Sequence, residues 1–263
     1  MTRALRGRHV VVTGGGAGLG AAIAAAFASD AATLTLMGRT EPTLAATADV
    51  LRSTFGVDAG AAICDVADPD SVARAFESAV RSRGPVHVLV NNAGYATAAP
   101  FQETTLKEWR QALDVNLTGT FLCTQRVLPA MIAAGEGRIV NIASTAGLRG
   151  YTRVAAYCAA KHGVVGLTRA LAAETKRTGV TVNAVCPGYI EGTPMLQAAI
   201  ANVARNTGTT EAVARATLAK GSPGGSFIEL GHVASRVVWL CSAETSAMTG
   251  HVVTFDDVGD ELS

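Results

Sequence analysis

Tyr157 and Lys161 are the residues whose types and spacing most clearly suggest chemistry. They are four positions apart in a stretch with helical periodicity, so their side chains share one helix face. A free tyrosine has a pKa of about 10 and is a poor base at neutral pH. A lysine ammonium about 4 Å away in partly buried surroundings contributes roughly 4 kcal/mol, or about three pKa units. The pair therefore predicts a phenol suited to proton transfer, although Tyr-x-x-x-Lys alone is also a common surface pairing.

Other polar residues follow two predicted strands. Ser144 comes directly after the apolar stretch 138–143, and Asn91-Asn92-Ala93-Gly94 closes the stretch 86–91. The carboxyl ends of parallel strands meet at one crevice, where such sheets bind ligands. We therefore expect Ser144 and the turn 91–94 to share a crevice with Tyr157. Asn116 lies in the long helical pattern after that turn.

A glycine-rich turn lies between the first strand-like run and the first helical pattern. Glycines there let the backbone turn tightly and approach a pyrophosphate, while the helix N-terminus offers free N–H groups. The strict G-x-G-x-x-G pattern does not fit, and only its variant ending in alanine does, through Gly16, Gly18 and Ala21. The pattern that fits better is Thr13-Gly14-x-x-x-Gly18-x-Gly20, with Leu19 between the last two glycines. The context predicts a nucleotide-binding turn, although a tight strand-to-helix turn alone would also use glycine.

The end of the second strand bears on which dinucleotide binds. An acidic residue there favours NAD, whereas a nearby arginine accepts the 2′-phosphate of NADP. The chain reads Met37-Gly38-Arg39-Thr40, so Arg39 favours NADP(H) and leaves NAD(H) as the alternative. The other interpretation of Arg39 is an ordinary exposed arginine at a helix start.

The elements that must position these residues alternate along the chain. Strand-like stretches cover residues 9–13, 34–37, 61–65, 86–91, 138–143, 180–186 and 251–255. Helical patterns between them cover residues 21–29, 42–54, 69–81, 105–132 and 154–178. This alternation predicts an α/β fold with a doubly wound parallel sheet of seven strands, flanked by helices in a single domain over residues 1–263. The segment 188–225 interrupts the alternation with two short helical patterns, 194–205 and 211–220, and is a candidate substrate lid.

Composition excludes several other classes of protein. The chain has 263 residues, of which 49% are hydrophobic and 16% charged, and its net charge is +1. So few charges argue against disorder, and the lack of a basic block argues against a nucleic-acid-binding protein. The five cysteines include no Cys-x-x-Cys pair and the five histidines show no metal-type spacing, so we expect reduced thiols, a cytoplasmic location and no metal site.

The N-terminal residues resemble a signal peptide at first sight. Arg3, Arg6 and Arg8 precede an apolar stretch, but the four glycines between positions 14 and 18 do not suit a helical signal core. We therefore expect a first strand and a glycine turn there. No run of about 18 strongly apolar residues occurs, so no membrane span is expected.

Together these motifs resemble those of the short-chain dehydrogenase/reductase family, in its single-domain branch, over nearly the whole chain. The matching motifs are Thr13-Gly14-x-x-x-Gly18-x-Gly20, Asp65-Val66, Asn91-Asn92-Ala93-Gly94, Asn116, Ser144, Tyr157-x-x-x-Lys161, Asn183 and Pro187-Gly188. The resemblance implies a Rossmann fold and an NAD(P)-dependent oxidoreductase that interconverts a ketone and a secondary alcohol.

The resemblance also implies residue roles. Tyr157 would exchange a proton with the substrate oxygen, Lys161 would lower the tyrosine pKa and hold the nicotinamide ribose, and Ser144 would bond the substrate oxygen. Asn116 would kink its helix and hold a proton-relaying water. The implied cofactor contacts beyond the glycine turn are Asp65 and Val66 at the adenine, Asn91, Ala93 and Gly94 on the adenosine side, and Pro187, Gly188, Ile190 and Thr193 at the nicotinamide.

The sequence departs from the family pattern in three places. One extra residue separates Pro187-Gly188 from Thr193, which weakens the carboxamide role of Thr193. Ala17 stands where many NADP-linked relatives carry a basic residue. The last strand ends in Phe255-Asp256-Asp257-Val258-Gly259 in place of Asp-Gly-Gly, which can alter C-terminal packing or subunit contacts.

The substrate side resembles both polyketide and acyl-thioester ketoreductases and 3-hydroxybutyrate dehydrogenases. Where the latter anchor a small carboxylate, this chain has Ala146, Val154 and Ala96, and an apolar lining disfavours a small free acid. We therefore favour a 3-oxoacyl thioester or another bulky ketone, and expect pocket walls at Tyr95, Tyr151, Tyr189 and Met195. Arg149 and Arg153 lie near the expected mouth, where they would meet a coenzyme A or carrier phosphate or remain solvated loop residues.

Three other interpretations stay open. A non-catalytic dinucleotide sensor would share the fold but typically loses the tyrosine or lysine. A dehydrogenase of small hydroxy acids such as 3-hydroxybutyrate would share the catalytic residues. An epimerase or dehydratase of the longer related branch would have another loop spacing and a larger C-terminal part. The resemblance further implies a homotetramer built partly from the helices 105–132 and 154–178.

Overall fold

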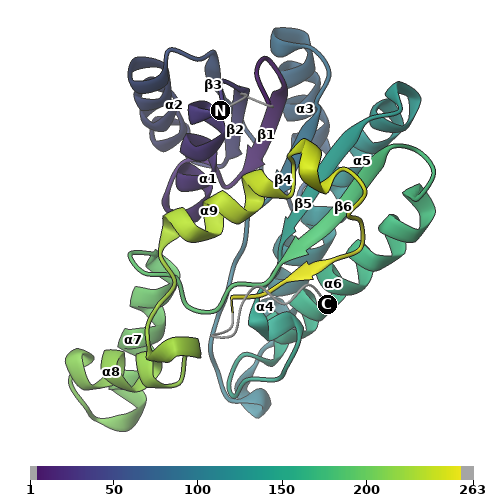
Figure 1. The fold of residues 1–263 in the computed structure, drawn as a ribbon. Helices are drawn as coiled ribbons and strands as arrows, with labels where there is room; N and C mark the ends of the chain where they lie inside the picture. The colour runs from purple at the N-terminus through teal and green to yellow at the C-terminus, as the bar shows by residue number, and fades with distance from the viewer. Residues whose placement is uncertain (1–4, 256–263) are drawn as a thin grey trace.

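Seven short strands form one parallel sheet in the order β3-β2-β1-β4-β5-β6-β7 (Figure 1). The structure is a computed structural model that describes residues 5–255. The strands are β1 (His9–Thr13), β2 (Thr33–Gly38), β3 (Ala59–Ile63), β4 (Val88–Asn91), β5 (Gly137–Ile142), β6 (Val180–Val185) and β7 (Val252–Val253). The direction of winding reverses between β1 and β4, which is where doubly wound sheets bind ligands. The predicted fold class is confirmed.

Alternating side chains along the strands bury both faces of the sheet. In β1, Val10 and Val12 pack with α1, α2 and α9, whereas Val11 packs with α3 and α5 on the opposite face. The α-helices are α1 (Gly18–Ser29), α2 (Glu41–Phe55), α3 (Pro69–Arg83), α4 (Leu106–Leu113), α5 (Gly119–Ala134), α6 (Ala155–Thr175), α7 (Pro194–Thr207), α8 (Glu211–Lys220) and α9 (Leu230–Trp239). Figure 1 shows this layered arrangement, with α7 and α8 standing apart from the sheet at one end.

Several predicted boundaries shift in the structure. The first helix begins at Gly18 instead of Ala21, and β3 begins two residues earlier than expected. The predicted helix 105–132 is two helices, α4 and α5, joined by the π-helical turn Asp114–Thr118. The amphipathic helix α9 was not predicted at all. Arg3 and the altered segment 256–259 lie outside the described residues.

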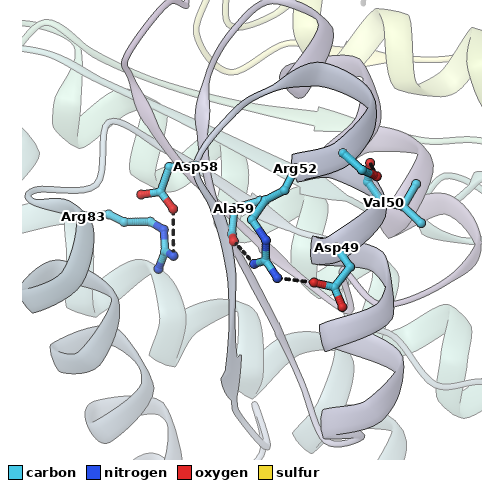
Figure 2. Close-up of polar contacts among 7 residues, drawn as sticks. Asp49, Val50, Arg52, Asp58, Ala59 and Arg83 are labelled. Carbon is cyan, nitrogen blue, oxygen red and sulfur yellow. Dashed lines mark hydrogen bonds and ion pairs between the residues drawn. The ribbon is translucent and has the colours of Figure 1, made fainter.

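The outer edge of the sheet is covered in part by two arginines. Figure 2 shows Arg52 reaching from α2, where its Nη1 donates to the Ala59 carbonyl at 2.6 Å and its Nη2 pairs with Asp49. Arg83 from α3 pairs with Asp58 at 3.0 Å and lies so close to Gly60 that a Cβ there would clash with its guanidinium. These contacts anchor the start of the edge strand β3 to the helices on both sides.

Candidate active site

Tyr157 and Lys161 are buried in the first two turns of α6. Tyr157 is 9% exposed and Lys161 is 4% exposed. The Lys161 Nζ lies 5.6 Å from the centroid of the Tyr157 ring and donates to the Ile142 carbonyl at 2.7 Å. Since Ile142 ends β5, this bond fixes the catalytic helix to the carboxyl end of the strand that leads to Ser144.

Burial controls the pKa of both groups. It raises the pKa of Tyr157 to about 12, against the opposing effect of a hydrogen bond with Ser144. It lowers the pKa of Lys161 to about 8, and no carboxylate among residues 5–255 pairs with the ammonium. The pKa of Tyr157 is therefore raised and not lowered as expected, because desolvation is the largest cause of the shift and Lys161 is not among the groups that cause it. A phenol with so high a pKa keeps its proton at neutral pH.

Ser144 stands at the point where β5 turns into a short 3-10 turn, Thr145–Gly147. Its hydroxyl accepts from the Ala146 N–H at 3.1 Å and lies close enough to Tyr157 to act on its pKa. The serine and the tyrosine therefore face each other, as their positions at the carboxyl end of β5 and in α6 predicted.

Asn116 lies inside the π-helical turn between α4 and α5 and is fully buried. Its Nδ2 donates to the Tyr95 carbonyl at 2.7 Å and to the Ala112 carbonyl at 2.8 Å, and its Oδ1 accepts from the Tyr95 N–H at 3.3 Å. A Cβ on Gly94 would lie 3.2 Å from Asn116 Oδ1 and 3.9 Å from Lys161 Nζ. Gly94, which has no side chain, therefore lies between Asn116 and Lys161, and the turn 91–94 is part of the site. The predicted departure from regular helix geometry occurs at Asn116, because a π-turn is inserted there.

The glycine turn fits a dinucleotide pyrophosphate. Gly14 has a φ of +65° and Gly18 of +53°, which favour glycine, and a Cβ on Gly14 would lie 2.9 Å from Asn92 Nδ2. A Cβ on Gly20 would clash with the Gly14 carbonyl, so α1 packs directly on the turn. No side chain caps the N-terminus of α1 and its first turn holds no acidic residue, which leaves N–H groups and the positive dipole end for an anion.

The predicted adenosine-side residues lie together next to this turn. Val66, Asn91 and Ala93 line a narrow crevice with Thr13 and Thr120. The Asn91 amide nitrogen is used inside the protein, since it donates to Thr124 Oγ1 at 3.0 Å and Asn141 Oδ1 at 2.9 Å. Its buried Oδ1 has no partner among the described residues. Asp65 is half-buried and accepts from the Ala67 N–H at 3.0 Å.

Arg39 follows β2 directly and is exposed. Its guanidinium makes no hydrogen bond or ion pair with the part of the chain that the structure describes. The end of β2 lies beside the glycine turn, because the Gly15 N–H donates to the Met37 carbonyl at 3.2 Å. Arg39 is thus a solvated cation near the candidate pyrophosphate site.

The segment after β6 connects the sheet to α7. Ile190 is buried and forms a parallel bridge with Ile228. The extra Gly192 has a φ of +73°, which allows the chain to turn before Thr193. The Thr193 hydroxyl donates to the Ile190 carbonyl at 2.9 Å and accepts from the Leu196 N–H at 3.3 Å, so it caps α7. Pro187 and Gly188 precede this segment, and the Pro187 carbonyl accepts from the Thr145 N–H at 3.0 Å.

Apolar side chains surround Tyr157 on the substrate side. Ala146, Tyr157 and Cys158 form one cluster, with Ala96 and Val154 packed against it. The three positions expected to replace carboxylate anchors are therefore all beside the tyrosine. The Tyr157 hydroxyl faces the Met195 sulfur at 3.9 Å, so the start of α7 covers the phenol.

Among the aromatic residues expected as pocket walls, Tyr189 lies close enough to Tyr157 to affect its pKa. Tyr95 is half-buried next to Gly94, and Tyr189 packs edge-on against Phe227. Burial raises the pKa of Tyr189, and the nearby Tyr151 raises it further. Tyr189 in turn raises the pKa of Tyr157.

The two mouth arginines have protein partners. Arg149 donates from Nε to the Tyr151 hydroxyl at 2.7 Å, and Arg153 donates to Asn206 Oδ1 of α7 at 3.3 Å. Arg153 has a φ of +68°, which is unusual for a residue with a side chain. Both guanidinium groups remain exposed.

Sequence reasoning missed several residues that hold the site together. Thr13 Oγ1 accepts from the N–H groups of Asn92 and Ala93 at 3.0 Å, which joins β1 to the turn after β4. Thr47 Oγ1 donates to the Gly16 carbonyl at 2.8 Å and braces the glycine turn from α2. A threonine at a strand end, such as Thr13, is a weak sequence signal for such bonds. The bond of Thr47 has no sequence signal, because its partner Gly16 is distant in the chain.

Comparisons with known proteins agree with this geometry. Residues 8–204 match the family model described as short chain dehydrogenase. A ketoacyl reductase assigned to the granaticin polyketide synthase of Streptomyces violaceoruber is 40% identical over 245 residues, which cover 92% of this chain and 89% of that protein. A D-beta-hydroxybutyrate dehydrogenase of Rhizobium meliloti is 35% identical, with 95% of this chain and 97% of that protein covered.

The fold also matches solved structures. The crystal structure of a single-residue variant of actinorhodin polyketide ketoreductase with NADPH superposes with a TM-score of 0.91 at 36% sequence identity. The match covers 95% of each chain. No helix within residues 5–255 has both the length and the apolar character that crossing a membrane requires.

Proposed function

This chain belongs to the short-chain dehydrogenase/reductase family, and from that premise we propose that it is an NADPH-preferring reductase of bulky, apolar 3-oxoacyl thioesters or related ketones. The chain is an oxidoreductase that interconverts a ketone and a secondary alcohol with a nicotinamide dinucleotide. The observation that carries the proposal is the group of half-buried Ser144 and buried Tyr157 and Lys161 at the carboxyl end of β5, with Asn116 next to it.

The protein residues supply a proton and an orientation. When bound, the nicotinamide supplies the hydride for reduction or accepts it for oxidation. Ser144 orients the substrate oxygen against Tyr157, and Tyr157 gives its proton to that oxygen as negative charge develops on it. The pKa of Tyr157, at about 12, keeps the phenol protonated at neutral pH, which is the form that can donate a proton during reduction.

Lys161 and Asn116 support the proton donor. The Lys161 ammonium lies next to the phenol ring and stabilises the phenolate left after proton transfer. Asn116 and Lys161 flank Gly94, and we propose that a water held there returns a proton to the tyrosine. Lys161 would also hold the nicotinamide ribose.

Replacing Tyr157 by Phe tests the assigned reaction. The variant keeps the ring and its packing but has no proton to donate, so kcat should fall at least about 1,000-fold while NADPH binding changes less than about threefold. Turnover is followed by NADPH absorbance and binding by the quenching of protein fluorescence. Unchanged turnover would refute the role of Tyr157, and absent turnover in the unaltered chain would favour the sensor interpretation.

Arg39 supports the preference for NADPH. It is an exposed guanidinium without a partner among residues 5–255, two residues beyond Met37, whose carbonyl accepts a bond from the glycine turn. A guanidinium is well suited to a 2′-phosphate. Arg39→Ala should weaken NADPH binding by about tenfold or more and NADH binding by less than about twofold. Equal losses for both cofactors would contradict the assignment.

The apolar surroundings of Tyr157 support a bulky ketone as substrate. Ala146, Val154 and Ala96 offer no charge to a small carboxylate, which argues against a free hydroxy acid. We propose Tyr95, Tyr151, Tyr189 and Met195 as the walls that contact the substrate chain. An NADPH screen with 3-oxoacyl thioesters, cyclic ketones and acetoacetate tests this, because a preference for free acetoacetate would favour the hydroxybutyrate dehydrogenase alternative.

We also propose a homotetramer in the cytoplasm. Large apolar side chains on and beside α4 and α5 are exposed, including Phe101 at 74% and Leu106 at 60%, as a subunit interface requires. All five cysteines are buried free thiols, which suits a reducing compartment. Light scattering at several concentrations tests the mass, and a monomer at micromolar concentration would contradict the assembly.

A further inference from the structure

A cavity of about 210 Å³ lies at the amino ends of the strands, at the opposite edge of the sheet from the candidate active site. Charged and polar residues at the starts of three neighbouring strands line it. Arg8 stands immediately before β1 and His87 immediately before β4, while Glu136 and Arg138 stand at the start of β5. The segment 241–246 after α9 lines another side. Since one water takes up roughly 30 Å³ in the liquid, the cavity is large enough for a small ion.

Positive charge exceeds negative charge in the wall of this cavity. Arg8 Nη2 pairs with Glu136 Oε1 at 2.8 Å, so these two charges balance each other. Arg138 donates only to backbone oxygens, from Nη1 to the Gly137 carbonyl at 2.9 Å and to the Gly179 carbonyl at 3.2 Å. Within residues 5–255 no carboxylate pairs with Arg138, and its buried Nε has no partner. One guanidinium charge in the wall is therefore not balanced by a protein group.

His87 adds a hydrogen-bond donor to the same wall. Its Nδ1 accepts from the His9 N–H at 3.1 Å, so a neutral ring carries its hydrogen on Nε2. Burial lowers the pKa of His87, which keeps the ring neutral at pH 7. In the part of the chain that the structure describes, the Nε2–H has no acceptor. An unbalanced guanidinium and a ring N–H that line one small cavity are donors suited to the oxygens of an anion.

We propose that this cavity is a binding site for a small oxyanion, a phosphate or a short carboxylate, held by Arg138 and His87. The Glu136 carboxylate competes with such an anion, because it already pairs with Arg8 and repels a second negative charge. A bound anion would link the starts of β4 and β5 to the segment after α9. The inference goes beyond the proposed reductase function and does not depend on it, since none of these residues lies at the carboxyl ends of the strands.

Equilibrium dialysis of the full chain against radiolabelled inorganic phosphate tests the site. We expect one bound phosphate per chain in excess NADPH, which covers the candidate pyrophosphate site. Arg138→Gln should weaken phosphate binding by about tenfold or more, and His87→Phe by about threefold. Arg81→Gln is the matched control, because Arg81 is an exposed arginine in the last turn of α3, and it should change binding by less than about twofold.

Glu136→Gln should have the opposite effect. It removes the competing carboxylate and releases Arg8, so phosphate should bind about threefold more tightly or better. The Glu136 side chain is 48% exposed, so the variant should fold like the unaltered chain. Tighter binding cannot come from damage to the fold, and this variant therefore decides the matter even if Arg138→Gln does not fold.

Competition identifies the class of anion. Unlabelled sulfate and malonate are added separately, and the one that displaces labelled phosphate at the lower concentration shows whether the cavity prefers tetrahedral anions or carboxylates. Displacement by neither would overturn the proposal. So would a loss of all bound phosphate on adding NADPH, because the anion would then lie at the glycine turn. Unchanged binding in Arg138→Gln, or binding that does not tighten in Glu136→Gln, would overturn it as well.

Discussion

The helix α6, which carries Tyr157, and the helices α7 and α8, which we propose as a substrate lid, are held by the protein in different ways, although Met195 of α7 lies against the Tyr157 hydroxyl. Behind α6, a buried amide and hydroxyl network joins three elements: Asn91 donates to Asn141, and Asn141 donates to Thr168 of α6 at 2.9 Å. Lys161 adds its own bond to the end of β5. Nearly all of these groups are out of reach of solvent.

The proposed lid depends on a small core of its own. Leu196, Ile200 and Ala214 form a cluster separate from the two large cores of the sheet. Its ion pair between Glu191 and Arg215 is more than two-fifths exposed on both sides, so water weakens it. Met195, which covers the Tyr157 hydroxyl, is 42% exposed. The groups around Lys161 are therefore more constrained by buried hydrogen bonds than Met195, which we propose as part of the substrate wall.

Among the tests of this comparison, the largest effect is expected from removing the fixed charge beside the phenol. Lys161→Met keeps the aliphatic side chain but loses the ammonium and its bond to the Ile142 carbonyl. We expect kcat for reduction to fall about 100-fold or more, measured by NADPH absorbance. A kcat within about threefold of the unaltered chain would contradict the comparison.

The pH dependence of reduction follows from the two buried groups. Reduction needs the Tyr157 proton, which is held up to a pKa of about 12, and the Lys161 ammonium, which is lost above a pKa of about 8. The free-enzyme kcat/KM should therefore be level below pH 8 and fall about tenfold per unit above it. A profile that stays level to pH 10 would show that the ammonium is not required.

The core of the sheet and the small core of α7 and α8 can be compared through one leucine in each. Leu34 of β2 and Leu196 of α7 are both fully buried. Leu34→Ala should lower the global free energy of unfolding by about 2–5 kcal/mol in urea denaturation. Leu196→Ala should move that free energy by less than about 1 kcal/mol but raise KM several-fold, because it loosens only the lid. Equal losses of global stability would show that the lid and the sheet unfold together.

Two asparagines give the smallest expected effects. Asn141→Leu removes a fully buried amide and leaves Asn91 with one partner fewer, which should cost about 1–3 kcal/mol of unfolding free energy. Asn206→Leu, on the exposed side of α7, removes only the bond to Arg153 and should cost less than about 0.5 kcal/mol. A larger loss of stability for Asn206→Leu than for Asn141→Leu would show that the hydrogen bonds of α7 are the more constrained ones.

Strong periodicity made much of the fold predictable. The apolar run of β1 and the capped helix α8 have the predicted bounds, because each has clear signals at both ends. The strand β3 was predicted two residues too late in the sequence, because its alanines and glycine give little strand signal. The start of α1 was placed too late, because a helix that begins on glycine contradicts intrinsic propensity and arises from the needs of the turn.

The site was predictable where one motif carries the signal and less so where distant segments meet. Tyr157, Lys161 and Ser144 lie together as expected. The pKa of Tyr157 was predicted in the wrong direction, because the degree of burial is set by packing that spacing alone does not reveal. The network of Asn91, Asn141 and Thr168 was missed for the same reason, since its members come from β4, β5 and α6.

The arginines at the outer edge of β3 affect how molecules meet in a crowded solution. The strand Ala59–Ile63 is small, neutral and free of proline, which is the composition that invites a strand from another molecule. Arg52 already uses the Ala59 carbonyl, and the charge of Arg83 lies over Gly60. A strand from another molecule would have to break that bond and approach two cations. Edge-to-edge pairing of sheets is therefore disfavoured, although β3 itself contains no charged residue.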